Sequence, residues 1–585
     1  MKSPIAAMGW EIWARNRWGF LAVLGALIAA AGIEGVAAIS LGVSRAGLLQ
    51  HPSLVERGDE VGWAVLALLL IMVASLVSIF VLFSYTETDY ATGEPRFPSR
   101  TFHLPISTLR LAGLPMAGGA LAGSVVYFLW RQFVFAPVGI FLPVTLPVVS
   151  LLLATLSLQA LVWGLPGLPA LRLLALSAVF VVFAAINFCT IAEIRTTGGP
   201  LAILENFIPP WPPGRIEGYN RGATGAAVFL AVAAAGMAVQ VVGRNRRGKW
   251  RGFKASAVGP ATSDGHFGAP FASRGAAQFW FEWRRNGTLL PWVTAGFSLI
   301  LLLPLPLLIK MDAPTTQTVF FAALGVPLLL AAVVGLGFGK LDFWSKEFAL
   351  SPFLSNWPIT NAQIITAKLK VAALATALSW LVAGIAVSVW LVCWGDRSLL
   401  ARDWADWQDG PGFLAVGLGA LAAGLLTWRF MIGSIHWGVW GRPKYFFLGA
   451  LGGNLAGLGL AVGGYFFFCT GSGASYRQLS WFPYLPWILA FVLALKLTAG
   501  AWGFSTARRR QLLSGAFVIT YVLFWLASSA CLVGVVFFLQ PHVAWKRHLL
   551  ALAVLLAMPL ARISVAPLAL DWNRHRRLRS SGGGG

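Results

Sequence analysis

Apolar runs of about 20 residues follow one another along almost the whole chain, and polar segments separate them. A helix needs about 20 largely apolar residues to cross a bilayer, so each run predicts one membrane span. The count predicts an all-α polytopic membrane protein with about 14 transmembrane helices, within a range of 12 to 14. The last run is the weakest, because Pro559, Arg562 and Pro567 interrupt it. The predicted spans are 18–41, 62–85, 111–135, 138–163, 170–193, 222–242, 288–309, 317–339, 371–394, 411–430, 446–469, 483–503, 514–539 and 549–570.

The composition agrees with this class and excludes others. Of the 585 residues, 58% are hydrophobic and 11% are charged, whereas soluble domains contain about 25% charged residues. These values exclude a soluble enzyme, a disordered chain and a fibrous protein. The four cysteines all lie in apolar runs, at spacings that match no zinc or redox motif. We expect them to be buried apolar side chains rather than disulfides or metal ligands.

The net charge of +23 has a topological explanation. With the N-terminus in the cytoplasm, the cytoplasmic segments hold 30 Lys and Arg against 9 Asp and Glu, and the outer segments hold 12 against 11. Cytoplasmic loops of membrane proteins contain such an excess of basic residues. We therefore expect an integral protein of the plasma (inner) membrane with both termini in the cytoplasm, in contact with the lipid bilayer and not with nucleic acid.

The chain contains an internal repeat. The pattern W-x-x-W-x-R-N occurs at residues 10–16 and again at 280–286, just before the first span of each half. Two Trp side chains one turn apart suit a short helix in the membrane interface, although an ordinary belt of aromatic and basic residues has the same composition. The residues of the two predicted interfacial helices are Trp10, Trp13, Arg15, Trp280, Trp283 and Arg285.

A second match follows the second span of each half, at an offset of 253 residues. Pro105-Ile106-Ser107 corresponds to Pro358-Ile359-Thr360, and two acidic residues precede each element. Two matches at equivalent positions predict a parallel duplication of six spans, with two extra spans at the C-terminal end. The predicted domains are 1–242, the first six-span half; 243–277, a basic cytoplasmic linker; 278–504, the second half; and 505–585, the two additional spans and a basic cytoplasmic tail.

The loops that contain the second match favour a docking surface. Ser107 and Thr360 are suited to cap the helices that follow them. Exposed aromatic residues in a compact loop, here Phe102 and Trp357, are typical of a contact with a partner. The alternative is a loop that folds onto its own membrane domain. The candidate coupling residues of the two loops are Asp89, Glu94, Phe102, Pro105, Ile106, Ser107, Asp342, Glu347, Trp357, Pro358, Ile359 and Thr360.

In these elements the chain resembles the membrane-spanning permease subunits of type-2 ABC exporters. Members of that family have six spans per half, an interfacial helix before the first span and a cytoplasmic loop after the second span. The loop contains a coupling helix that seats in a cleft of an ATPase subunit. The resemblance implies an exporter permease that couples to two copies of a separate ABC ATPase, which bind ATP and Mg²⁺ themselves. The two extra spans depart from the six-span pattern of the family.

A search for catalytic motifs favours a chain that is not itself an enzyme. Residues 243–250 approach the phosphate-binding pattern G-x-x-x-x-G-K-[ST], but Trp250 stands where Ser or Thr must bind magnesium. We assign no catalytic residue, no metal site and no cofactor to this chain. A multi-spanning enzyme such as a lipid-linked glycosyltransferase remains an alternative, with Glu56, Asp59 and Glu60 in an outer loop as its acidic residues.

The charge count leaves three charged residues inside predicted spans, Glu34, Lys496 and Arg562, and two of them are weighed as functional residues. Glu34 lies in the outer half of the first span, and Lys496 lies deep in the twelfth. Charges inside a bilayer cost about 3 kcal/mol on insertion scales and often have a function. A proton-coupled secondary carrier, which uses such residues, is therefore a second alternative. Neither residue is repeated in the other half, and a long Lys side chain is able to reach the interface.

Overall fold

The computed structural model describes residues 4–40, 95–165, 213–247, 273–302, 313–340, 358–395, 412–442, 444–449, 484–539 and 544–581, with residue 271 and short pieces of 72–88 and 171–183. The described chain is helical almost throughout. Its strands are β1 (Glu87–Thr88) and β2 (Pro95–Arg96), which form a two-residue antiparallel ladder.

The chain divides into two compact units, and each is described by itself. The first unit contains Met1–Gly265, Trp344–Lys346 and Phe447–Thr470. The second contains His266–Phe343, Glu347–Phe446 and Gly471–Gly585. The change of unit after Gly265 lies inside the segment that the sequence predicts as a linker, 243–277.

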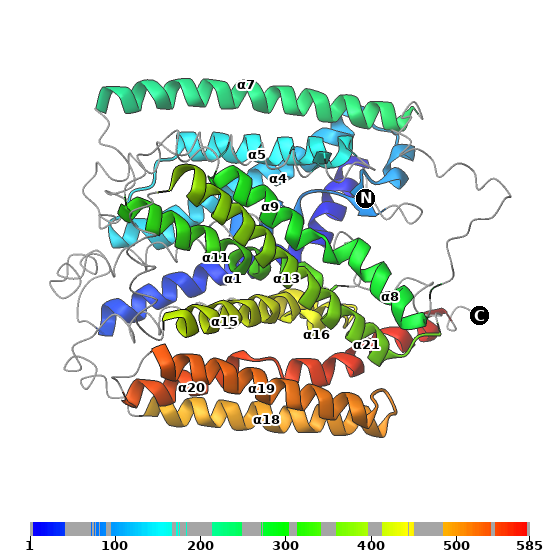
Figure 1. The fold of residues 1–585 in the computed structure, drawn as a ribbon. Coiled ribbons are helices and arrows are strands. Elements are labelled where there is room, and N and C mark those ends of the chain that lie inside the picture. The colour runs from blue at the N-terminus through cyan, green and yellow to red at the C-terminus, as the bar shows by residue number, and fades with distance from the viewer. Residues whose placement is uncertain are drawn as a thin grey trace. The chain divides into compact units, whose positions relative to one another are not determined.

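The described part of the first unit consists mainly of long helices (Figure 1). In chain order its further elements are α1 (Pro4–Ser40), η2 (Ser99–His103), α4 (Thr108–Trp130), η3 (Arg131–Phe135), η4 (Ala136–Val138), α5 (Thr145–Gly164) and α7 (Pro213–Arg246). The residues of the predicted interfacial helix and of the first span belong to one continuous helix, α1.

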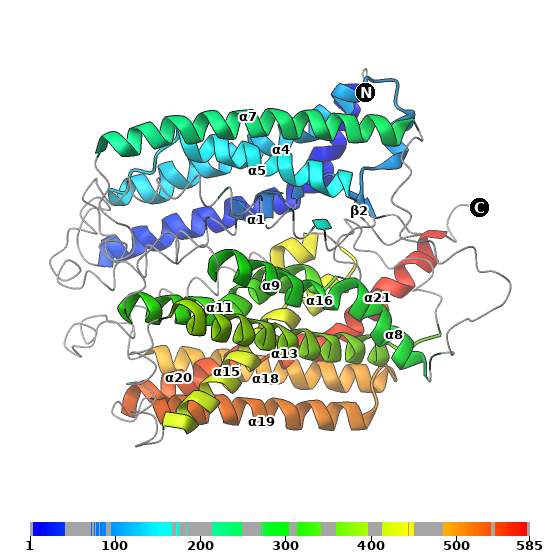
Figure 2. The ribbon, with the colours of Figure 1, turned by 45° about the horizontal axis from the view of Figure 1, so that its top comes forward.

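Helix α7 packs along α5 and also contacts α4 (Figures 1 and 2). One face of α7 consists of small residues at helical spacing, including Ala227, Ala231, Ala234 and Ala238, and all four are buried. Small side chains let two helix backbones approach closely in a membrane. The opposite face exposes large apolar groups such as Phe229, which suits contact with lipid.

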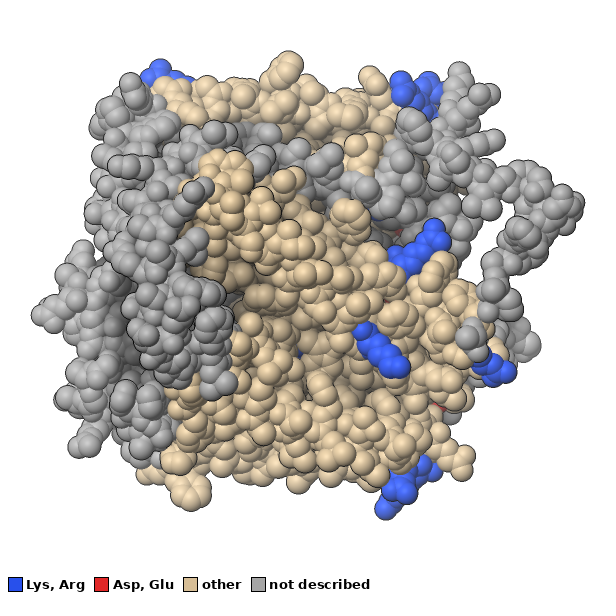
Figure 3. All heavy atoms as spheres, viewed as in Figure 1, with Lys and Arg blue, Asp and Glu red and all other residues tan. Residues whose placement is uncertain are grey.

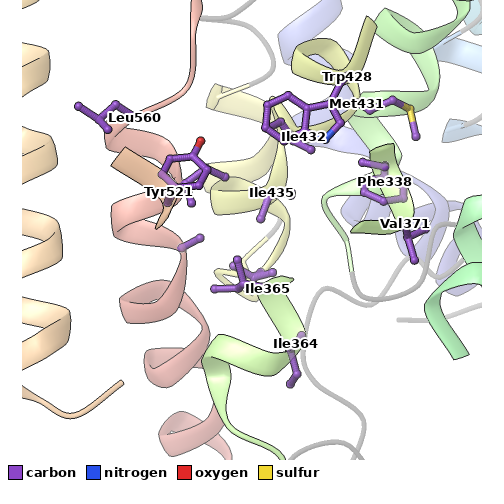
Figure 4. Close-up of a cluster of buried hydrophobic side chains, with 14 of the residues drawn as sticks. Phe338, Ile364, Ile365, Val371, Trp428, Met431, Ile432, Ile435, Tyr521 and Leu560 are labelled. Carbon is purple, nitrogen blue, oxygen red and sulfur yellow. The ribbon is translucent and has the colours of Figure 1, made fainter. Parts of the chain in front are cut away.

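The second unit contains more helices and one large apolar core. Its elements are α8 (Arg274–Glu282), η6 (Trp283–Gly287), α9 (Leu289–Leu302), α11 (Ala313–Phe338), α13 (Asn361–Trp394), α15 (Gly412–Ile432), α16 (Ile435–Gly438), α18 (Leu485–Arg509), α19 (Gly515–Leu539), α20 (Ala544–Ala557) and α21 (Ala561–Ser581). Helix α13 packs against α9, α11 and α15, and α18 packs against α20 and α21. Figure 4 shows the core between them, with Phe338 of α11, Val371 of α13 and Met431 of α15 among its fully buried members.

Glycines allow α11 to approach the bend between α15 and α16 at backbone contact. A Cβ on Gly335 would overlap the carbonyl oxygen of Phe430, and one on Gly438 would overlap the backbone of Gly339. Ser434, in the bend, accepts a hydrogen bond from the Gly339 N–H at 3.1 Å and donates one to the Gly335 carbonyl. This contact fixes the end of α11 against the bend.

Within the described residues, eight helical stretches, some with a bend or break, are long and apolar enough to cross a membrane, which fits an integral membrane protein. They are Thr108–Val138, Thr145–Gly164, Gly218–Arg246, Asn361–Trp394, Gly417–Gly438, Pro486–Arg509, Gly515–Val535 and Ala551–His575. Each coincides with one of the 14 runs predicted above, and the shorter apolar helices Asn16–Gly32 and Ala323–Phe338 coincide with two more. On the face shown in Figure 3, uncharged residues cover most of the described surface.

The last predicted span is interrupted where the sequence places Pro559. Helix α20 ends at Ala557 and α21 begins at Ala561. Proline has no N–H and its ring clashes with the preceding turn, so a helix stops before it unless other contacts compensate. Pro567, by contrast, lies inside α21.

Candidate functional site

The first predicted coupling element ends in a helix cap. Ser107 has extended backbone angles, and its Oγ accepts a hydrogen bond from the backbone N–H of Arg110 at 3.4 Å, at the start of α4. Ile106 is buried, whereas Pro105 is exposed. The prediction that Ser107 caps this helix is therefore confirmed.

The second coupling element has the same local structure with a stronger cap. Thr360 Oγ1 accepts from the Gln363 N–H at 3.2 Å, and Gln363 Oε1 accepts from the Thr360 N–H at 3.1 Å. This reciprocal pair is a capping box at the start of α13, so the predicted cap is confirmed here too. Ile359 is buried, and Pro358 is exposed.

An arginine from a neighbouring helix end holds each of these turns. Arg246, at the end of α7, donates to the carbonyl oxygens of Ile106 at 2.6 Å and Leu104 at 2.9 Å. Arg274, at the start of α8, donates to the carbonyl oxygen of Pro358 at 3.0 Å. Both elements are thus fixed in place by a guanidinium group while their proline rings stay exposed.

Phe102 packs within its own unit. Its ring stacks on Phe97 with centroids 5.7 Å apart, and Phe97 meets Trp163 edge to face at 4.9 Å. Phe102 is half-buried in this position. For Phe102 the contacts favour the alternative weighed above, a loop side chain that folds onto its own membrane domain.

The other predicted coupling residues lie outside the described residues. They are Asp89, Glu94, Asp342, Glu347 and Trp357.

The helices that follow the two elements bury corresponding residues. At the same offset of 253, eight of the eleven buried positions of α4 match a buried position of α13. Two helices that begin at equivalent caps therefore turn the same face inward, in the same register. The matching pairs are Leu111 and Ile364, Ala112 and Ile365, Pro115 and Lys368, Gly119 and Ala372, Ala122 and Ala375, Gly123 and Thr376, Val126 and Ser379, and Trp130 and Ala383.

The two W-x-x-W-x-R-N segments expose tryptophan and bury asparagine. Trp10, Trp13 and Trp280 are each about half exposed, and Trp283 is half-buried against Gly287. Asn16 and Asn286 are buried, at 2% and 0% exposure. In the second segment, Arg285 lies over the ring of Phe281 at 5.3 Å. The side chain of Arg15 lies outside the described residues, and the interfacial position of both segments stays a prediction.

Asn286 belongs to a buried polar cluster that sequence analysis missed. Glu282 of α8 forms an ion pair with Lys368 of α13 at 3.0 Å, and the two side chains are 1% and 0% exposed. Asn286 donates to Glu282 Oε2 at 2.8 Å, and Gln278 donates to Oε1 at 3.3 Å. Both oxygens of the Glu282 carboxylate therefore accept hydrogen bonds from protein side chains.

Lys368 also binds backbone carbonyls at the end of α11. Its Nζ donates to the carbonyl oxygens of Phe338 at 3.3 Å and Lys340 at 2.8 Å, at the end of α11. In the first unit, Gln159 of α5 donates to the carbonyl of Phe83 at 2.7 Å, close to the same place in the repeat. The free carbonyls at a helix end need such partners when they are buried.

Lys496, which the sequence places deep in a span, lies at the break between α20 and α21. Its Nζ donates to the carbonyl oxygens of Leu555 at 2.6 Å and Leu556 at 3.0 Å, and also to that of Met558. The Nε of Arg429, a residue that sequence analysis did not single out, donates to the Ala557 carbonyl at 2.9 Å. The sequence alone does not show that Lys496 and Arg429 bind carbonyl oxygens at the end of the same helix, α20. Glu34, which the sequence places in the first span, is buried in the first unit.

Of the four cysteines, Cys393 and Cys531 lie within the described residues, and Cys189 and Cys469 lie outside them. Cys393 and Cys531 are unbonded, but Cys393 is exposed, so the prediction of a buried side chain is wrong for this residue. It shares the outward face of α13 with Val389, which is 55% exposed. The described part of the chain contains no group of three or more His, Cys, Asp or Glu that would hold a metal ion.

Comparison with known proteins gives no match to a family model, to a curated protein or to a solved structure.

Proposed function

We propose that the chain is the permease subunit of an ATP-driven ABC exporter, in which two fused six-span halves form the membrane passage and a separate ATPase supplies the energy. The observation that supports this most is the pair of capped elements before α4 and α13. They share a sequence pattern, an exposed proline, a buried isoleucine and a clamping arginine. Their following helices bury the same face at one offset.

An internal duplication explains this agreement better than chance. A helix has several possible faces, and the cap alone does not decide which of them turns inward. Duplicated sequences inherit both the cap and the buried face. The full count of 14 spans, as six plus six plus two, belongs to this proposal, with both termini in the cytoplasm of a cell whose plasma membrane contains the protein.

The two elements are suited to transmit force. Each exposes a proline ring and a cap residue, and each is tied to a helix end by a guanidinium group. A partner that pushes on such an element moves a long helix directly, because the first turn of α4 or α13 is fixed to it. Two ATPase subunits, one on each element, follow from the duplication.

The contacts of Phe102 change which residues anchor the partner. Because Phe102 stacks within the first unit, we assign docking in the first loop to the exposed residues around Pro105. In the second loop we keep Trp357 as the aromatic anchor. A buried aromatic anchor contributes about 2 kcal/mol or more to an interface, which corresponds to about a thirtyfold change in affinity.

The experiment is co-purification of the tagged full-length chain from its native membranes. We expect an ATPase to accompany the wild type, and Trp357→Ala to release it or to uncouple its hydrolysis. Trp487→Ala is the matched control, since Trp487 lies on α18 and is 76% exposed. An ATPase that stays fully bound and fully coupled in Trp357→Ala contradicts the docking assignment.

A proton-coupled carrier is the second candidate, and the place of Lys496 near the middle of α18 favours it. A carrier needs no motor subunit. The same co-purification therefore separates the two functions, because a carrier retains no ATPase under conditions that keep the chain folded.

A further inference from the structure

The break between α20 and α21 gathers three cations inside the second unit. Lys496 of α18 and Arg429 of α15 bind the free carbonyls at the end of α20. Arg562, in the first turn of α21, donates through Nη1 to the carbonyl of Gly433 at 3.2 Å. Arg562 and Arg429 both lie close enough to Lys496 to repel its charge.

No carboxylate among the described residues of the second unit neutralises these charges. Glu282 pairs with Lys368, and Asp571 lies against Arg510 at 4.0 Å and His575 at 3.2 Å. The helix ends that the cations contact supply only partial charge, about −0.5 each. Two such ends leave roughly two positive charges uncompensated within membrane-spanning helices, where an isolated cation is costly.

The guanidinium groups of Arg429 and Arg562 have N–H donors that make no hydrogen bond to the described residues. Arg429 uses Nε alone, and Arg562 uses Nη1 alone, within the described part of the chain. A guanidinium has five N–H donors in a planar fork that fits carboxylate and phosphate oxygens. Both residues are half-buried, so a ligand has access to the remaining donors.

The start of α21 adds backbone donors at the same place. The first backbone hydrogen bond of this helix runs from the Ser564 N–H to the Leu560 carbonyl. Leu560 precedes the helix and has no side-chain oxygen with which to cap it. The N–H groups of residues 561–563 accordingly have no acceptor among the described residues, and such helix starts bind anions.

A buried histidine is a further unpartnered group near Arg562. His436 of α16 is 7% exposed and close enough to Arg562 to interact with its charge. Its Nδ1 has no hydrogen-bond partner in the described residues. A hydroxyl or a protonated acid group is a suitable donor to a neutral imidazole nitrogen.

We infer that Arg429, Lys496, Arg562 and the start of α21 form an intramembrane binding site for an anionic group, a carboxylate or a phosphate. Tyr521, whose hydroxyl donates to the Pro559 carbonyl at the same break, and Leu560 belong to the apolar core of the second unit (Figure 4). The ligand is the headgroup of an anionic lipid or a soluble anion of the same chemistry. The site stands apart from the proposed ATPase partner and needs none.

The test uses the full-length chain in nanodiscs of phosphatidylcholine. One arm adds phosphatidylglycerol and counts retained lipid by native mass spectrometry, and the other adds inorganic phosphate or acetate and records the shift in unfolding temperature. Retention of phosphatidylglycerol supports a lipid ligand, and stabilisation by the free anions supports a soluble one. If neither arm shows binding to the wild type, the proposal is wrong.

Variants test whether the arginines of the site bind the anion. We expect Arg562→Gln to weaken binding at least tenfold and Arg562→Lys, which keeps the charge but loses the planar fork, to weaken it less than Arg562→Gln. Arg508→Gln, an exposed change at the end of α18, is the control and leaves binding unchanged. Should Arg562→Gln fail to fold, Arg429→Gln and Arg429→Lys replace that pair. Wild-type binding in a folded charge-removing variant overturns the assignment.

Discussion

Lys368 Nζ lies 3.0 Å from Glu282 Oε2, and this ion pair joins α8 to α13 with both side chains out of contact with solvent. Removing one partner leaves a buried charge, so Lys368→Met should cost about 3–5 kcal/mol of stability. The combination with Glu282→Gln should cost less than the sum of the two single changes. Thermal unfolding in detergent measures all three variants, and strictly additive losses would show that the pair is not coupled.

The glycines of α11 provide a second prediction. Gly335→Ala places a methyl group against the Phe430 carbonyl and should destabilise the second unit by about 1–3 kcal/mol. Gly325→Ala, on the same helix, meets nothing within 4 Å and should be neutral or slightly stabilising. The unfolding temperatures of the two variants form the comparison. Equal shifts would contradict the close approach of α11 to the bend after α15.

The capping box makes a smaller but specific prediction. Thr360→Ala removes the acceptor for the Gln363 N–H and should cost about 1 kcal/mol, whereas Thr360→Ser retains it and should cost little. Hydrogen exchange of the first turn of α13 locates the effect. Faster exchange in both variants would mean that the methyl group, and not the hydroxyl, stabilises this helix start.

Local patterns predicted the local structure. Apolar length placed the helices, and a Ser or Thr after Pro-Ile placed the caps at Ser107 and Thr360, because both signals act over a few neighbouring residues. The buried pair Glu282 and Lys368 was not predictable in this way, since 86 positions separate its members. The contact of Arg429 with the Ala557 carbonyl was not predictable either, since 128 positions separate the two residues.

Some signals in the sequence were visible but ambiguous. Pro559 marked the break before α21, yet Pro567 looked equally disruptive and is accommodated within the helix. The sequence predicts Phe102 as an exposed docking residue, because its pattern does not show that Phe97 stacks on the ring. In the W-x-x-W-x-R-N segments both asparagines are buried, at 2% and 0% exposure, although the tryptophans are the more prominent residues of the pattern.

The orientation of the chain follows from its charge and has a direct test. We expect a cysteine introduced at Ser256 to be labelled from the cytoplasm and one introduced at Asp403 to be labelled from outside, by a reagent that does not cross membranes. The native cysteines are replaced first, because Cys393 is exposed. Labelling of Asp403→Cys only after the membrane is permeabilised would reverse the orientation.

The mass of the purified assembly tests the central claim most directly. Because the chain is proposed to contain both six-span halves, one copy of this 62.7 kDa subunit should bind two ATPase subunits. Native mass spectrometry of the complex from its own membranes gives the stoichiometry without knowledge of the substrate. One copy of the chain with two ATPases is the predicted result. Two copies of the chain, or a folded chain that retains no ATPase, would contradict the account.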